Sequence, residues 1–134
     1  KGTPKTMQKN TKYKSLVKDI IKSLKDSIKT ALKAGIKEEK IIIDPGIGFG
    51  KTAEQNLEIL KNLGEFEILK KPILIGTSRK SFIGKILDKA PSERIFGTMA
   101  GCVIRVLIGA NILRINCIKG VRDAIKITDA IMRA

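Results

Sequence analysis

Three short apolar runs, each followed by a segment with helical periodicity, constrain the fold of this chain more than any other feature. The runs span residues 40–44, 72–76 and 111–116 and are rich in β-branched residues, as strands of a buried sheet are. A further helical segment precedes the first run. Strands that alternate with helices form parallel sheets with right-handed crossovers, so the sequence predicts an α/β fold.

The first two helices carry clear signals at their ends. Apolar residues recur at helical spacing over residues 11–34, and Gly35 closes that helix. Thr52 and Gln55 have the spacing of a capping box, which predicts a helix that starts there and stops at Gly64.

Three more helices are predicted in the second half of the chain. A short one follows a polar turn at residues 77–81 and ends near Leu87. The next starts at Pro91 and ends at Gly109, and we expect its inward face to consist of Ile95, Met99, Val103, Val106 and Leu107. The last starts at Gly120, and its apolar face is expected to contain Val121, Ala124, Ile125, Thr128 and either Ile131 or Met132.

Size and charge narrow the class of protein. A chain of 134 residues with 43% hydrophobic residues suits one domain, and no apolar run approaches the ~20 residues of a membrane helix. The net charge of +14 is compatible with nucleic-acid binding, but only 4% of residues are aromatic, which leaves little for base stacking. We favour a solvated, lysine-rich surface, which is also compatible with a basic rim around an anionic small substrate.

The sequence contains no histidine, which excludes Ser-His-Asp and Cys-His catalysis and any histidine metal site. Cys102 and Cys117 fit no metal-ligand spacing and lie in apolar stretches, so both are expected to be buried thiols. An enzyme built from this sequence must therefore work with carboxylates, lysines, arginines and backbone groups.

A glycine-rich loop follows the first predicted strand. Asp44 ends the strand, and three alternating glycines at residues 46, 48 and 50 would let a ligand approach the backbone. Pro45 stands where a P-loop needs its first glycine, and Lys51 stands where a dinucleotide-binding fingerprint needs its last. Both nucleotide patterns are excluded, which leaves a different small-molecule site or a tight turn without a ligand.

Polar residues also follow the other two predicted strands. Residues 77–81 place two cations and three hydroxyls ahead of a helix N-terminus, which suits an anion; a serine cap beside a surface Arg-Lys pair is the alternative. Arg114 shares one side of an apolar strand with Asn116, so it needs a ligand or a structural ion pair. Because parallel strands end at one edge of a sheet, we expect Asp44, Lys80 and Arg114 to meet there.

These blocks resemble those of the dihydropteroate synthase family. Residues 44–51 and 76–84 are similar to its two signature blocks, and the second is the more specific because other pterin-binding barrels lack it. Residues 93–100 resemble the family's following helix, residues 112–116 its last strand, and residues 2–8 the loop after its fifth strand. The resemblance implies that residues 1–134 form the C-terminal portion of a (β/α)8 TIM barrel, with strands 6–8 and their helices.

The resemblance also implies an activity. The family consists of cytoplasmic transferases of folate biosynthesis, which join 6-hydroxymethyl-7,8-dihydropterin diphosphate to p-aminobenzoate and release dihydropteroate and pyrophosphate. By resemblance, Asp44 accepts hydrogen bonds from the amino and ring N–H groups of the pterin. Lys80 donates to the pterin near the reacting centre, and Arg114 stacks on the pterin and holds the diphosphate, so these two are the predicted catalytic residues.

Three more positions complete the substrate-binding set that the resemblance implies: Phe49, Ser81 and Asn116. Ser81 would lie near the carboxylate of p-aminobenzoate. Family members usually carry histidine where this chain has Asn116, which can donate a hydrogen bond to phosphate but carries no positive charge.

The resemblance further concerns cofactor and partners. The family's Mg²⁺ ligand lies in the first five strands, which this chain would lack, so we predict no metal ligand among its own residues and no turnover by the chain alone. Full-length members are expected to form homodimers and to bind neither nucleic acid nor membranes. The alternatives are a pterin-binding methyltransferase-type barrel, a noncatalytic half-barrel that assembles with a partner, and a basic nucleic-acid-binding domain.

Overall fold

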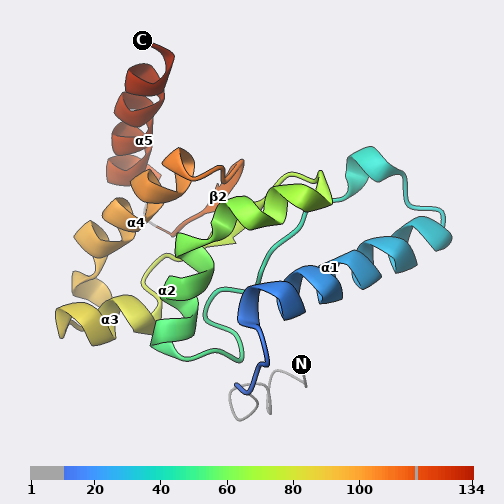
Figure 1. Cartoon of the computed structure of the whole chain (residues 1–134). Coiled ribbons are helices and arrows are strands. Elements are labelled where there is room, and N and C mark those ends of the chain that lie inside the picture. Colours follow the sequence, from blue (N-terminus) through green and yellow to red (C-terminus); the bar gives the residue numbers. More distant parts are fainter. Residues whose placement is uncertain (1–10, 117) are drawn as a thin grey trace.

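The computed structural model describes residues 11–116 and 118–134, in which helices alternate with short parallel strands, so the predicted α/β fold is confirmed (Figure 1). The α-helices are α1 (Leu16–Lys33), α2 (Ala53–Lys61), α3 (Ser81–Leu87), α4 (Ile95–Leu107) and α5 (Ile118–Arg133). Short 3₁₀ helices lie between them: η2 (Glu38–Lys40), η3 (Leu63–Leu69) and η4 (Pro91–Glu93). The strands are β1 (Leu74–Gly76) and β2 (Ile112–Arg114).

β1 lies between two parallel neighbours. It pairs with β2 in a register that sets Gly76 opposite Arg114. On its other side Ile73 forms a parallel bridge with Ile43, and the N–H of Leu74 donates to the carbonyl of Ile43 (2.8 Å). Because all three segments run in the same direction, the residues that follow them lie at one edge of the sheet.

The paired segments are shorter than the sequence predicts. Strands are expected over residues 40–44, 72–76 and 111–116, whereas pairing is limited to the bridge at Ile43 and to β1 and β2, and Lys40 belongs to η2 instead. Within the described residues, Ile43 and β2 each pair on one side only. On their unpaired sides, the backbone groups of these two segments therefore have no neighbouring strand with which to form hydrogen bonds within the described residues.

The predicted helix ends are partly confirmed. α1 ends just before Gly35, which has the left-handed φ of +84°, but it begins at Leu16 rather than at residue 11. The capping box of Thr52 opens α2 as predicted. The predicted stop at Gly64 is wrong, because the chain continues there as η3, which buries two large apolar side chains in the core.

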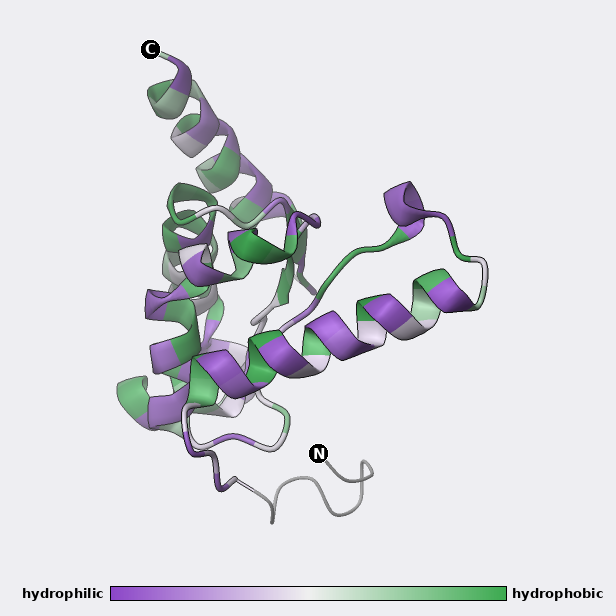
Figure 2. Cartoon of the chain, turned by 45° about the vertical axis from the view of Figure 1, so that its right-hand side comes forward, coloured by the Kyte–Doolittle hydropathy of each residue, from purple (hydrophilic) through white to green (hydrophobic). Residues whose placement is uncertain are grey.

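One hydrophobic cluster joins the sheet to the helices, and its buried members are Leu16, Val17, Ile20, Ile43, Ile47, Ile59, Leu60, Leu63, Phe66, Ile73, Ile75, Phe82 and Ile83. The helices contact one another in chain order, α1 with α2, α2 with α3, α3 with α4, and α4 with α5. Apolar and polar bands alternate along α1, and its C-terminal end projects from the body with η2 (Figures 1 and 2). Among the described helices, none combines the length and apolar character needed to cross a membrane.

The inward face of α4 differs from the prediction. The buried residues are Thr98, Cys102 and Arg105, whereas the predicted Leu107 is half exposed and the predicted Ile95, Met99, Val103 and Val106 are only half-buried. The reason is that Thr98 and Arg105 form hydrogen bonds with the turn that follows β1, so this polar stripe faces inward. The expectation of a buried thiol is thus confirmed for Cys102, while Cys117 lies outside the described residues.

α5 largely follows its predicted pattern. It begins at Ile118, slightly before the predicted Gly120. Its predicted inward residues Val121 and Thr128 are buried, but its last turn extends beyond α4, so Ile131 and Met132 are 70% and 60% exposed.

Candidate functional site

Charged side chains from three parallel segments meet at one edge of the sheet. Asp44 follows the bridge residue Ile43, Arg114 ends β2, and Lys80 follows the turn after β1. The guanidinium Nη2 of Arg114 lies 3.7 Å from the Oδ2 of Asp44. The Nζ of Lys80 lies 4.5 Å from the ring centroid of Phe49, a cation–π contact. The structure thus brings together one carboxylate, two cations and one aromatic ring.

The Lys80 ammonium is partly withdrawn from water and donates a hydrogen bond to the carbonyl of Ile47. Burial lowers the pKa of Lys80, Asp44 opposes this shift, and the positive charges of Arg114 and Arg105 add to it. Since cations outnumber the single carboxylate, the edge is suited to a ligand that carries several negative charges.

The glycine-rich loop is fastened by its own residues. The N–H of Gly46 donates to Asp44 Oδ1 (2.8 Å), and Lys51 Nζ donates to the carbonyls of Gly46 (2.9 Å) and Phe49 (3.0 Å). Burial lowers the pKa of Lys51, an effect that Asp44 opposes. Lys51 therefore holds the loop together, because its ammonium binds two backbone carbonyls of the loop.

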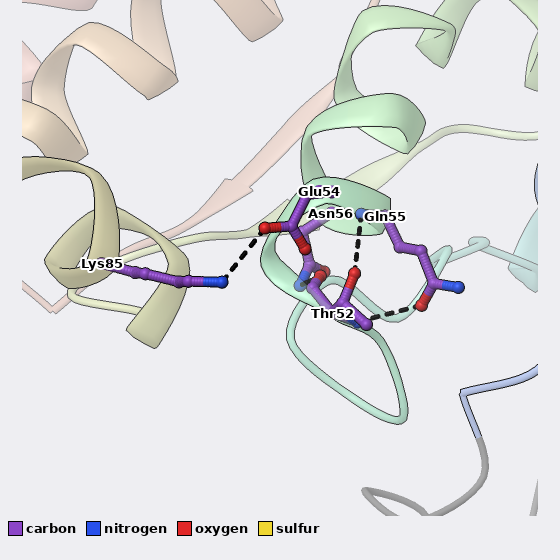
Figure 3. A network of polar contacts seen from close by, with 5 residues as sticks. All are labelled: Thr52, Glu54, Gln55, Asn56 and Lys85. Atoms are coloured by element: carbon purple, nitrogen blue, oxygen red, sulfur yellow. Dashed lines mark hydrogen bonds and ion pairs between the residues drawn. The ribbon is translucent and has the colours of Figure 1, made fainter.

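α2 anchors the far end of the loop (Figure 3). Thr52 Oγ1 accepts from the N–H of Gln55 (3.2 Å), and Gln55 Oε1 accepts from the N–H of Thr52 (2.9 Å), which confirms the predicted capping box. Asn56 Nδ2 donates to the carbonyl of Thr52 (2.7 Å). Lys85 Nζ of α3 donates to Glu54 Oε1 (3.1 Å); hydrogen bonds, first from its own backbone N–H and then from Lys85, lower the pKa of Glu54 to about 2.

Two glycines leave the space through which the cations reach the site. A Cβ at residue 48 would lie 2.8 Å from Cδ of Lys80, and the φ of Gly48 is +80°. A Cβ at residue 76 would lie 2.9 Å from Nη2 of Arg114. Both distances are too short for non-bonded atoms, so the two cationic side chains cross backbone that carries no side chain.

The remaining predicted site residues lie at the rim. Phe49 is 45% exposed, and Ser81 is the exposed first residue of α3, directly after Lys80. Asn116 is exposed, and its backbone N–H donates to Ser78 Oγ (3.2 Å), which ties the end of β2 to the turn after β1. Residues 2–8, the segment that resembles a loop of the family, lie outside the described residues.

Comparison with known proteins identifies the family. The family model for pterin binding enzymes matches residues 1–116. The chain belongs to the pterin-binding enzyme family.

Curated members similar to the chain are dihydropteroate synthases. The chain is 43% identical to the enzyme of Synechocystis over 134 residues, which cover 99% of this chain and 46% of the relative. It is 39% identical to the enzyme of Escherichia coli K12, with 99% and 47% covered, and 50% identical to that of Clostridium beijerinckii, with 92% and 46% covered. The chain therefore spans about half the length of the curated relatives it matches.

Solved structures of this family share the fold. Yersinia pestis dihydropteroate synthase with a sulfonamide drug complex superposes with a TM-score of 0.97 at 36% identity, over 100% of this chain and 49% of that one. The Thermus thermophilus enzyme in complex with 6HMPPP superposes with a TM-score of 0.90 at 33% identity, over 96% and 51%.

Sequence reasoning missed the residues that support this edge of the sheet from behind. Asn56 is 2% exposed, and its Oδ1 accepts from the N–H of Gly48 (2.6 Å). Arg105 is 3% exposed; its Nη1 donates to Thr77 Oγ1 (2.7 Å), its Nε has no partner among the described residues, and burial lowers its pKa to about 10. A signal was present, because Thr98 and Arg105 flank Cys102 at helical spacing and so define a polar inner face of α4.

Proposed function

We propose that the chain acts in folate biosynthesis as part of a dihydropteroate synthase, which joins 6-hydroxymethyl-7,8-dihydropterin diphosphate to p-aminobenzoate and releases dihydropteroate and pyrophosphate. The observation that carries the proposal is the meeting of Asp44, Lys80 and Arg114 at one edge of the sheet. The names of the relatives, at 39% to 50% identity, support it.

The proposed roles follow from the chemistry of each side chain. The Asp44 carboxylate would accept from the pterin amino and ring N–H groups, because its two oxygens offer about four acceptor sites and the N–H of Gly46 uses one of them. Lys80 and Arg114 would face the pterin and its diphosphate. Three rim residues complete the proposed substrate-binding set: Phe49 as a wall, Ser81 near the p-aminobenzoate carboxylate, and Asn116 near phosphate.

The reaction proposed for this site separates bond breaking from bond making. The bond between the pterin methylene and the diphosphate oxygen breaks, pyrophosphate leaves with the electron pair, and the arylamine attacks the resulting pterin cation before losing a proton. At ~4 Å and an effective dielectric near 20, one charge pair contributes on the order of 4 kcal/mol. Lys80 and Arg114 can therefore stabilise the departing pyrophosphate substantially.

We further propose that residues 1–134 are the C-terminal part of a (β/α)8 barrel and supply strands 6–8 with their helices. Three observations support this proposal: the three parallel segments, the pairing of their outer members on one side within the described residues, and the coverage of about half of each relative. The complete protein is proposed to be a cytoplasmic homodimer. Exposed apolar side chains on α3 and α4, which include Ile86, Leu87 and Ile104, are compatible with such an interface.

The reaction is proposed to use Mg²⁺. In the described part of the chain, no three histidine, cysteine, aspartate or glutamate side chains group closely enough to hold a metal ion. We propose that its protein ligand comes from the first five strands of the complete barrel, which this chain does not contain.

A turnover assay of the purified 134-residue chain tests the proposal. We expect no turnover and weak pterin binding by the chain alone, and turnover when the N-terminal half of the Clostridium beijerinckii relative is supplied. Lys80→Ala and Arg114→Ala should each lower that turnover on the order of 10²- to 10³-fold.

Three results would count against the proposal. Full turnover by the chain alone would contradict its status as half of a barrel. Absence of pterin binding with and without the added half would contradict the enzymatic function. Binding of methyltetrahydrofolate, without any dependence on p-aminobenzoate, would favour a methyltransferase-type barrel.

A further inference from the structure

The turn that carries Lys80 is held from behind by side chains and backbone of neighbouring elements. Thr77, only 1% exposed, accepts a hydrogen bond from Arg105 Nη1 of α4 (2.7 Å). Ser78 Oγ accepts from the backbone N–H of Asn116 (3.2 Å). The turn therefore depends on contacts that come from α4 and from the end of β2.

Arg79, the next residue, has a strained backbone. Its φ is +55°, in the left-handed region that residues with a Cβ seldom adopt. Its N–H donates to Thr98 Oγ1 of α4 (3.1 Å), and its carbonyl accepts from Nη1 of Arg94, the residue before α4 (3.0 Å). Both backbone polar groups of the strained residue are thus bound by side chains, and Thr98 is fully buried.

Gly84 of α3 makes room for Arg94. A Cβ at residue 84 would overlap the guanidinium of Arg94, whose Nε also donates to the carbonyl of Lys89 (2.8 Å). The guanidinium therefore lies fixed between the turn and the end of α3. The glycine that ends the signature block at residues 76–84 is needed by this contact and not by the backbone of the helix.

We propose that Arg94 and Thr98 are positioning residues for Lys80, an inference that rests on the proposed function of this lysine in substrate binding. Neither residue takes part in the contacts among Asp44, Lys80 and Arg114. They hold Arg79 in the left-handed conformation, which sets the direction in which the chain enters Lys80. Without them residue 79 relaxes to a right-handed or extended conformation and carries the ammonium away from the carbonyl of Ile47 and the ring of Phe49.

The titration of Lys80 in the 134-residue chain, followed by NMR of lysines labelled at Cε, tests this proposal. The Lys80 signal is assigned by its loss in Lys80→Arg. In the wild type we expect a pKa below the ordinary 10.5, because the ammonium is partly buried. Thr98→Val should move this pKa toward 10.5, whereas Thr98→Ser, which keeps the hydroxyl, should not.

A matched control and a second route make the test specific. Thr128→Val removes a buried hydroxyl of α5 that donates to the carbonyl of Ala124 (2.9 Å), and it should leave Lys80 unchanged. Arg94→Gln should act like Thr98→Val and replaces it if that variant does not fold. Gly84→Ala should act in the same way, but in the Arg94→Gln background it should add nothing, because the guanidinium it displaces is already gone.

Binding of inorganic diphosphate, measured on the same variants, separates this inference from the proposed function. We expect Thr98→Val to weaken it about tenfold, which corresponds to about 1.4 kcal/mol. An unchanged Lys80 titration in both Thr98→Val and Arg94→Gln overturns the positioning role, whatever the ligand does. A shifted titration with unchanged diphosphate affinity supports the positioning role and contradicts the proposed role of Lys80.

Discussion

At the scale of single residues, the site depends on the absence of a Cβ atom at two glycines as much as on its charges. The side chains of Arg114 and Lys80 pass over the backbone of Gly76 and Gly48 at distances that leave no space for a Cβ. A side chain at either glycine would therefore move a cation without changing any charge in the protein. Substitutions at these glycines therefore test the position of the cations separately from the net charge of the site.

Gly76→Ala should displace the guanidinium of Arg114 from Asp44 and weaken binding of inorganic diphosphate. The loss of one charge-assisted contact, about 1.5–3 kcal/mol, corresponds to roughly ten- to hundredfold in affinity. Calorimetric titration measures the affinity. Gly64→Ala is the matched control, because nothing lies within 4 Å of a Cβ at that position. Equal affinities of the two variants would show that Arg114 does not depend on the space at Gly76.

The lowered pKa of Lys80 predicts a pH dependence. Diphosphate binding should weaken as the pH rises through that lowered pKa, and Lys80→Arg should retain binding at alkaline pH because arginine keeps its charge. Titrations at a series of alkaline pH values measure this effect. If diphosphate affinity fell over the same pH range in the wild type and in Lys80→Arg, the pH dependence would come from a group other than Lys80.

The same shift has a consequence for stability. Because the folded-state pKa lies below the unfolded value of 10.5, the unfolded chain binds this proton more tightly, and burial of the ammonium opposes folding at neutral pH. The contribution of Lys80 to stability therefore increases as the pH rises through its lowered pKa toward 10.5.

At the scale of elements, a helix fixes the glycine-rich loop, and Asn56 makes the connection. Its Oδ1 accepts from the N–H of Gly48 in the loop, and its Nδ2 donates to the carbonyl of Thr52 at the helix start (2.6 and 2.7 Å). This buried amide satisfies backbone groups on both sides of the turn between strand and helix.

Asn56→Ala should destabilise the chain by about 1–3 kcal/mol, because the N–H of Gly48 and the carbonyl of Thr52 would lose the partners that this side chain supplies. Denaturant unfolding measures the change. Asn62→Ala removes an exposed amide that donates to the carbonyl of Glu58 (2.8 Å), and it should have a smaller effect. Equal losses of stability would refute a special role for Asn56 in the loop.

Elements with local signals could be predicted from the sequence, and those set by tertiary contacts could not. The capping box of Thr52 and the turn at Gly35 are local, and both are confirmed. The meeting of Asp44 and Arg114 could be predicted because parallel strands end together. The inner face of α4 was predicted wrongly, because the more numerous apolar residues favoured a face that includes Val103. The polar residues Thr98 and Arg105 also recur at helical spacing, but only their contacts with the turn after β1 show that they face inward.

At the scale of the whole molecule, the described residues form three parallel segments and a row of helices that contact one another in chain order. Within the described residues, the segment at Ile43 and the strand β2 each have an unpaired side. Exposed strand edges invite pairing with other chains, and a sheet of so few strands has little stability of its own.

The isolated chain should therefore associate as its concentration rises, which light scattering measures. The N-terminal half of a relative should reduce this association, because in the proposed barrel it would cover both edges and replace contacts between copies. Serum albumin added at equal mass is the control for a nonspecific effect of added protein on association. A monodisperse monomer at all concentrations would show that the edges are protected in another way.

The position of β1 between its two neighbours links the ligand to folding. Asp44 and Arg114 lie far apart in the sequence, and they approach only when both partners have docked on β1, which makes their contact dependent on long-range closure of the chain. If a diphosphate binds there, as the proposed function requires, it binds only the folded chain in which the three segments are paired. At a concentration about one hundred times its dissociation constant, it would add about 2.7 kcal/mol to the free energy of unfolding. On the proposed function, the diphosphate-bearing substrate would then stabilise the folded chain as well as occupy its site.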